Sequence, residues 1–151
     1  MPDPAELHLA REVDVPFEKV EAALRAGPER WVPGVRRDGE RLTTELTYAQ
    51  AGTRIERRIE LEVGPVQKFA YGVTAHVRWR GAGRPELYPE LEGHLRVEPT
   101  SEGGSTLRFD ARYTPPAGRL GATVDRALMH RVAESSVNDF IDRVVRRLGG
   151  G

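Results

Sequence analysis

Residues 118–148 read GRLGATVDRALMHRVAESSVNDFIDRVVRRL, and the glycines Gly149–Gly151 follow them. The apolar residues of the C-terminal half recur with the three- and four-residue spacing of one helical face: Val137, Ile141, Val144, Val145 and Leu148. Gly118 and Gly121 flank the start of the predicted helix, and the final glycines are a typical helix end. Such a helix is roughly 40 Å long at about 1.5 Å per residue, so only a large sheet can cover it.

The chain before this helix alternates between apolar and polar residues with the period of two that is typical of β-strands. One strand is predicted at residues 7–15, and six more at residues 35–37, 41–49, 53–63, 69–80, 91–97 and 106–114. Asp38-Gly39 is a strong hairpin signal between two of them. Each long strand has one apolar face and one face of mixed charge, which indicates an antiparallel sheet with one face in water.

Two short helices are predicted between the first and second strands. Pro16 ends the first strand and favours the first turn of a helix, in which Phe17 and Val20 follow at helical spacing. A second short helix is predicted at residues 29–32. Together the elements predict an α+β fold in a single domain of residues 1–151, because a chain of this length leaves little room for a second domain.

The composition argues against several functional classes. Basic and acidic residues balance at 23 each, whereas proteins that wrap nucleic acid usually carry an excess of positive charge, so we expect no nucleic-acid partner. The absence of cysteine excludes disulfides and thiolate chemistry. The N-terminus, Met1–Pro4, has no signal-peptide pattern, and no run approaches the ~18 apolar residues that span a bilayer. We therefore expect a cytoplasmic protein without stable membrane insertion.

No metal, cofactor or phosphate loop is predicted. The histidines His8, His76, His94 and His130 have no metal-ligand spacing with one another, and no glycine-rich loop is followed by the Lys of a phosphate-binding motif. His76 and His94 fall on the charged outer face of the predicted sheet, where they are expected to be solvated.

Polar residues interrupt the apolar face at the middle of the C-terminal helix. His130 and Glu134 continue the apolar stripe by steps of four, and Arg131, Ser135 and Asn138 continue a second, rotated face. A tight core is costly at this point because buried polar groups need partners, whereas a pocket that holds a ligand or water supplies them. The alternative is a partly solvated helix in which His130 and Glu134 form an ordinary surface pair.

The predicted inner face of the sheet carries Tyr48, Tyr71, Trp79 and Tyr113, whose rings have polar tips, and Arg57 shares its phase with the buried side of its strand. Such groups suit a mostly apolar ligand with one or two oxygens, and a buried guanidinium needs an acid or an anionic ligand. The alternatives are core aromatics bonded to backbone or water, and a strand end or bulge that turns Arg57 outward. The predicted ligand-binding residues are Tyr48, Arg57, Tyr71, Trp79, Tyr113, His130, Glu134 and Asn138.

The chain resembles the START-like or Bet v 1-like (SRPBCC) superfamily, most of all its polyketide cyclase/dehydrase and lipid-transport branch. The resemblance covers nearly the whole chain and rests on VDVPFEKV at residues 13–20, YTPPAGRLG at residues 113–121 and DRALMHRVAE at residues 125–134, the last two similar to bacterial members. It implies a helix-grip fold: a seven-stranded curved antiparallel sheet around the long C-terminal helix, with two short helices after the first strand and a hydrophobic cavity. Members bind lipids, polyketides, plant hormones or sterols, and some cyclise or aromatise polyketides.

Three functional hypotheses remain open. The first is a protein, monomeric or homodimeric, that holds an apolar lipid- or polyketide-like ligand between sheet and helix. The second is an enzyme of the cyclase, aromatase or dehydratase kind, in which His130 or a tyrosine is the general acid or base and Arg57 steadies an enolate. No motif maps residue by residue onto such a site, so the sequence leaves open whether a reaction is catalysed. The third is a regulatory or protein-interaction domain with a filled core.

Overall fold

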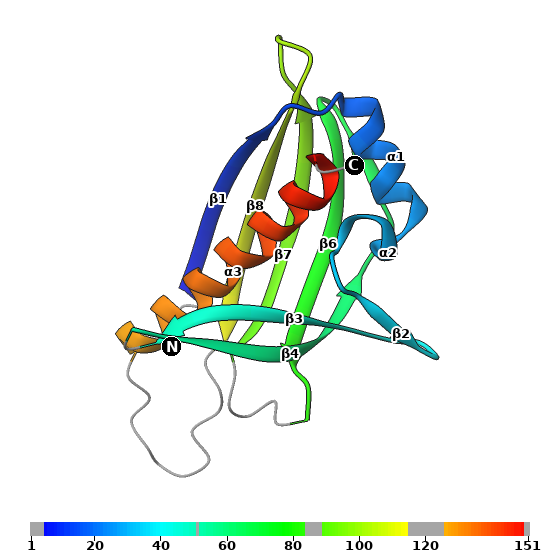
Figure 1. Cartoon of the computed structure of the whole chain (residues 1–151). Coiled ribbons are helices and arrows are strands. Elements are labelled where there is room, and N and C mark those ends of the chain that lie inside the picture. The colour runs from blue at the N-terminus through cyan, green and yellow to red at the C-terminus, as the bar shows by residue number, and fades with distance from the viewer. Residues whose placement is uncertain (1–4, 51, 84–88, 115–125, 150–151) are drawn as a thin grey trace.

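The computed structural model describes residues 5–50, 52–83, 89–114 and 126–149 (Figure 1). The described elements are β1 (Ala5–Val13), α1 (Phe17–Ala26), α2 (Pro28–Trp31), β2 (Arg36–Asp38), β3 (Arg41–Gln50), β4 (Thr53–Val63), β5 (Gln67–Phe69), β6 (Gly72–Gly81), β7 (Glu90–Pro99), β8 (Ser105–Thr114) and α3 (Arg126–Gly149). They confirm the predicted α+β class. The predicted helix start near Gly118 and Gly121 lies outside the described residues. The described helix α3 has 24 residues, which corresponds to about 36 Å.

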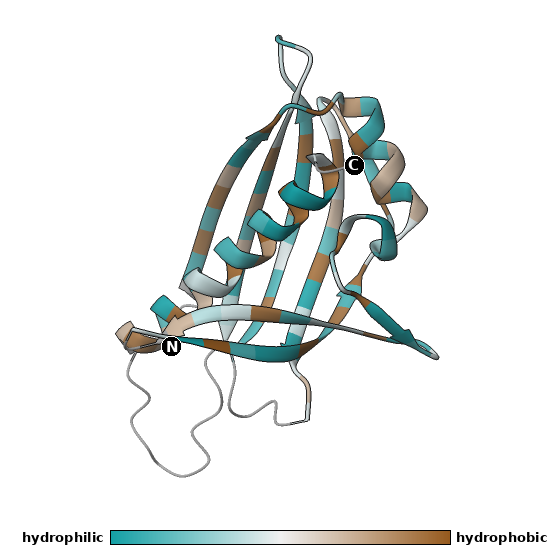
Figure 2. Ribbon diagram, in the orientation of Figure 1, coloured by the Kyte–Doolittle hydropathy of each residue, from teal (hydrophilic) through white to brown (hydrophobic). Residues whose placement is uncertain are grey.

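The strands form one antiparallel sheet in the order β1-β8-β7-β6-β4-β3-β2, with β5 paired to β6. The pairing registers align buried residues of neighbouring strands in rows on the face that α3 covers, and one row holds Trp79, Leu91 and Tyr113. Apolar and hydrophilic residues alternate along β1 as this arrangement requires (Figure 2). The strands curve around α3, which lies against the concave side of the sheet (Figure 1). This is the predicted curved sheet around a long helix.

The strand predicted at residues 69–80 is divided in two. β5 ends at Phe69, β6 begins at Gly72, and the two pair as a hairpin. A Cβ at Gly72 would collide with the carbonyl group of Val97 on β7, so the close approach of the strands requires glycine there. This division accounts for an eighth strand in a sheet that was predicted with seven.

Four aromatic rings fill the core between the C-terminal half of α3 and the sheet. Phe140 of α3 lies against Trp31 of α2, Trp79 of β6 and Phe109 of β8, with ring centroids 6.3, 5.0 and 5.9 Å away. Each of these side chains is at most 1% exposed. Protein cores are packed as densely as organic crystals, so this part of the helix rests on side chains rather than on an open cavity.

Helix α3 covers the edge of β3 that β4 leaves free. The backbone N–H of Thr47 donates to Asp139 Oδ2 at 2.9 Å, and that of Ala49 donates to Ser135 Oγ at 3.1 Å. Arg143 adds a bond from Nη2 to Thr47 Oγ1 at 3.0 Å. Its Nε lies 2.8 Å from Asp139 Oδ2. The two groups form an ion pair, but the Nε–H group does not make a hydrogen bond. Side chains of α3 thus satisfy main-chain donors that an exposed edge strand leaves open.

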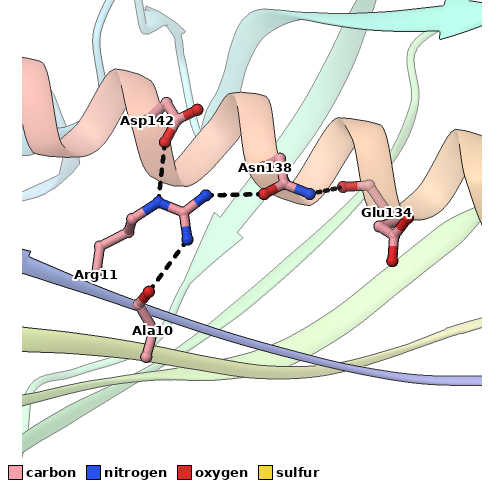
Figure 3. Close-up of polar contacts among 5 residues, drawn as sticks. All are labelled: Ala10, Arg11, Glu134, Asn138 and Asp142. Carbon is pink, nitrogen blue, oxygen red and sulfur yellow. Dashed lines mark hydrogen bonds and ion pairs between the residues drawn. The ribbon is translucent and has the colours of Figure 1, made fainter.

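The opposite edge of the sheet, β1, is joined to the same helix through Arg11 (Figure 3). Arg11 Nη2 donates to Asn138 Oδ1 at 2.9 Å, Nε lies 3.3 Å from Asp142 Oδ1, and Nη1 donates to the carbonyl of Ala10. Asn138 Nδ2 in turn donates to the carbonyl of Glu134 at 2.9 Å. The helix therefore contacts both edges of the curved sheet, and its polar side chains make these contacts.

The helix pair α1 and α2 lies at one end of the sheet. Gly27 between the two helices has φ = +114°, a conformation that favours glycine, and Pro28 begins α2 at the position where a missing N–H costs least. The predicted helices are confirmed, with α2 shifted by one residue. No helix among the described residues is long and apolar enough to cross a membrane.

Candidate ligand site

The polar side chains at the middle of α3 point in different directions and do not line one pocket together. The buried face of the helix is Val132, Ala133, Ser136, Val137, Phe140, Ile141 and Val144. Arg131 and Glu134 are exposed, Ser135 binds β3, and Asn138 binds Arg11. Glu134 therefore lies toward solvent and Asn138 toward the β1 edge, and whether either residue contacts a ligand stays a prediction.

His130 lies against a buried side chain of the inner sheet face, Tyr113. Its Nδ1 lies 3.3 Å from the hydroxyl of Tyr113, and the two ring centroids are 5.8 Å apart. Tyr113 is only 4% exposed, and burial raises the pKa of its phenol above the ordinary value, so it is a neutral donor at physiological pH. Leu128 and Met129 beside His130 are half-buried. The first turns of α3 thus combine one polar pair with apolar surroundings.

Tyr48 and Trp79 lie on the inner face, as predicted. Tyr48 is 5% exposed on β3, and the next residue, Ala49, is bonded to Ser135 of α3. Tyr48 and Tyr113 therefore approach the N-terminal half of α3 from different strands. Trp79 belongs to the aromatic core, where it is stacked on Phe109 at 6.2 Å. Whether these residues contact a ligand stays a prediction.

Tyr71 and Arg57 are not placed inside the sheet. Tyr71 is 74% exposed because it lies in the turn between β5 and β6 rather than in a continuous strand. Arg57 stands opposite the buried Leu46, so its predicted side of the sheet is correct. However, β4 pairs with β6 only from Ile59 to Val63, so among the described strands β4 has no second neighbour at Arg57, and the side chain is exposed. Neither residue lies with Tyr113 and His130.

Three of the histidines fall in one row on the outer face. His8, Asp110, His94 and His76 are successive cross-strand partners, and they border an open depression of about 510 Å³. Asp110 Oδ1 lies 2.7 Å from His8 Nδ1, and this hydrogen bond raises the pKa of the exposed imidazole. His76 Nε2 lies 3.1 Å from Glu92. Within the described ranges, no three His, Asp or Glu side chains are arranged to hold a metal ion.

Comparison with known proteins identifies the fold. No protein-family model matches the chain, and no curated protein matches its sequence. Several solved structures match its backbone. Ara h 8.0201 does so with a TM-score of 0.58 at 12% identity, over 99% of this chain and 100% of that chain.

Two enzymes match to a similar extent. Norcoclaurine synthase from Thalictrum flavum has a TM-score of 0.57 at 11% identity, over 98% of this chain and 86% of that chain. Zhui aromatase/cyclase from Streptomyces sp. R1128 has a TM-score of 0.54 at 12% identity, over 97% and 94%. The chain has the helix-grip fold of the Bet v 1-like and START-like proteins. Because a fold hosts many activities, the function must come from the site.

Proposed function

We propose that this protein, acting as a single domain, binds an apolar, lipid- or polyketide-like small molecule that carries a hydrogen-bonding oxygen. The site is the end of the helix grip where the first turns of α3 meet β8 and β3. The observation that supports it is the partly buried contact of 3.3 Å between the Tyr113 hydroxyl and His130 Nδ1. The folds of an aromatase/cyclase and of norcoclaurine synthase, which also match the chain, agree with a small-molecule site.

The geometry of the polar pair favours an additional partner. Hydrogen bonds between nitrogen and oxygen are usually 2.7–3.2 Å long, so a contact of 3.3 Å is longer than usual and weak. A ligand oxygen near the Tyr113 hydroxyl would accept a shorter bond from the phenol, while the half-buried Leu128 and Met129 would contact its apolar part. Small-molecule sites generally combine a few polar groups with an apolar lining in this way.

The aromatic core limits how far the ligand reaches. Phe140, Trp79 and Phe109 occupy the space under the C-terminal half of α3. A ligand that displaced them would lose packing of about 3–5 kcal/mol per large aromatic side chain. We therefore place the ligand beside Tyr113 and Tyr48, not along the whole length of the helix.

The test is a matched pair of ligands and a matched pair of variants. An apolar fluorescent probe and its hydroxylated or ketone analogue are titrated into wild type, Tyr113→Phe and Tyr71→Phe. The oxygenated ligand should bind Tyr113→Phe about tenfold more weakly, which corresponds to one lost hydrogen bond of about 1.4 kcal/mol. Tyr71→Phe, at an exposed position, should change nothing. Equal losses in both variants, or no saturable binding to folded wild type, would contradict the proposal.

A second candidate function is general acid–base catalysis on a bound carbonyl compound. The phenol of Tyr113 and the imidazole of His130 approach one point, as such a mechanism requires. The test is hydrogen–deuterium exchange at the carbon next to the carbonyl of a bound ketone, followed by NMR in D₂O. His130→Gln should abolish the exchange while the ketone still binds. Exchange that is no faster than in buffer would leave binding as the function.

A further inference from the structure

A depression separate from the candidate ligand site lies where α3 meets the free edge of β3. It is a depression of about 270 Å³ bordered by Gly34 of the α2–β2 loop, Arg36, Glu45, Arg58 and Arg143. Arg143 is thirteen residues farther along α3 than His130, about 20 Å at 1.5 Å per residue, so the two sites are separate. Gly34 has φ = +67°, a conformation that disfavours a side chain, which keeps this wall of the depression low.

The backbone of β3 leaves one position of its edge open inside this depression. Pairing with β2 ends at Thr43, and the side chains of α3 take over at the amide of Thr47. Alternate residues of a strand direct their N–H and C=O groups to the same side. Since the amides of Thr47 and Ala49 point toward α3, the amide of Glu45 points to the same edge, between β2 and Asp139. The gap therefore presents a main-chain N–H donor.

Three guanidinium groups line this depression. Arg143 is held in place by Asp139 and by the hydroxyl of Thr47. Arg58 Nη2 lies 3.7 Å from the Glu45 carboxylate, too far for a hydrogen bond. Arg36 borders the same depression, and no carboxylate of the described residues lies within ion-pair distance of it. Positive charge thus exceeds negative charge around a backbone donor.

We propose that this depression binds a phosphate group, either as inorganic phosphate or as a phosphomonoester. Guanidinium groups recognise oxyanions through paired N–H donors, and such charge-assisted bonds are roughly twice as strong as neutral ones. The volume of about 270 Å³ holds a phosphate group together with several waters. The Glu45 carboxylate competes with phosphate for the same guanidinium donors. Loss of Arg58 should therefore weaken phosphate binding, whereas loss of the charge of Glu45 should strengthen it.

The experiment is isothermal titration of the full chain with inorganic phosphate at constant ionic strength. Wild type should show saturable binding, and Arg36→Gln and Arg58→Gln should bind about tenfold more weakly, as expected for the loss of one charge-assisted bond. The matched control is Arg80→Gln, an outer-face arginine 3.1 Å from Glu60 that lies outside the depression, and its affinity should equal that of wild type. Absence of saturable binding, or an equal loss in Arg80→Gln, would overturn the assignment.

Glu45→Gln separates a phosphate site from an arginine cluster that only neutralises Glu45. Removal of the competing carboxylate should strengthen phosphate binding several-fold, and the backbone amide signal of residue 45 should shift during an NMR titration. An unchanged or weaker affinity would place phosphate elsewhere and refute the proposal. Phenyl phosphate in the same titration distinguishes the two sources, because tighter binding of the ester identifies a phosphomonoester, and equal or weaker binding identifies free phosphate.

Discussion

Asp139 and Asp142 lie three residues apart on α3 and fasten it to opposite edges of the sheet, yet the structure predicts very different costs for their loss. The side chain of Asp139 is 16% exposed, accepts the amide of Thr47 and pairs with Arg143. The side chain of Asp142 is 53% exposed and has a single contact of 3.3 Å with Arg11. Asp139→Ala therefore leaves the Thr47 amide without its acceptor and the partly buried Arg143 guanidinium without its ion-pair partner.

The magnitudes follow from these environments. A hydrogen bond to a charged group contributes about 1.5–3 kcal/mol, and the lost ion pair with Arg143 adds to this cost, so Asp139→Ala should lower the free energy of unfolding by about 3 kcal/mol. For a domain of this size that corresponds to a decrease in Tm of about 6–12 °C. Asp142→Ala removes an exposed ion pair and should cost at most about 1 kcal/mol. Asp139→Asn keeps an oxygen acceptor and should fall between the two.

Urea denaturation measures the free energy of unfolding of each variant, and native-state hydrogen exchange measures the protection of the Thr47 amide. In wild type the Thr47 amide should be protected, and in Asp139→Ala it should exchange faster than the neighbouring amides that bond to β4. In Asp142→Ala its protection should be unchanged. If the two alanine variants were equally stable, or if the Thr47 amide stayed protected without Asp139, α3 would not hold the edge of β3 through this carboxylate.

Three further predictions test the core, the sheet and the pH dependence. Phe140→Ala should cost about 3–5 kcal/mol in chemical denaturation, because it empties the centre of the aromatic core; a cost below about 1 kcal/mol would mean that the ring is not packed there. Gly93→Ala should cost about 1–3 kcal/mol, since a Cβ would stand 2.6 Å from the carbonyl of Asp110; an unchanged Tm would refute this close approach. His8 has a folded-state pKa raised above 6.5 by Asp110, so its stabilising contribution is complete below pH 6.5 and is lost as pH rises through the folded pKa. An NMR titration of His8 should give a lower pKa in Asp110→Asn, and an equal pKa would contradict the pairing.

Most of the fold could be predicted because its signals are local. Period-two alternation and turn residues located every long strand, and the helical spacing near the C-terminus located α3. The division of β5 from β6 could not be found in this way. It depends on Val97 of β7, which approaches Gly72 only after the sheet has formed. Arg57 shows the same limit, since its side of the sheet follows from alternation but its exposure depends on where β6 stops pairing with β4.

The local sequence pattern could not predict the roles of the polar residues on α3, because their partners lie far away in the sequence. Asp139 binds an amide 92 positions away, and Asn138 binds Arg11 at a separation of 127 positions. A residue that caps a sheet edge and a residue that lines a pocket have the same polar appearance in a sequence.

Phe140 was missed for a different reason. It lies three residues after Val137 and four before Val144, so helical spacing does contain the signal that it faces the core.

The geometry of the α-helix explains why, of four residues spaced by four, only His130 lies against Tyr113 on the inner face of the sheet. An α-helix turns by about 100° per residue, so each step of four advances about 40° beyond a full turn. From His130 through Glu134 and Asn138 to Asp142, the direction of the side chain therefore rotates by about 120°. His130 points toward Tyr113, Glu134 is exposed, and Asn138 and Asp142 reach Arg11 at the β1 edge. The rotation thus carries this series from the inner face of the sheet to the β1 edge, which is why we propose the ligand site only at the first turns of α3.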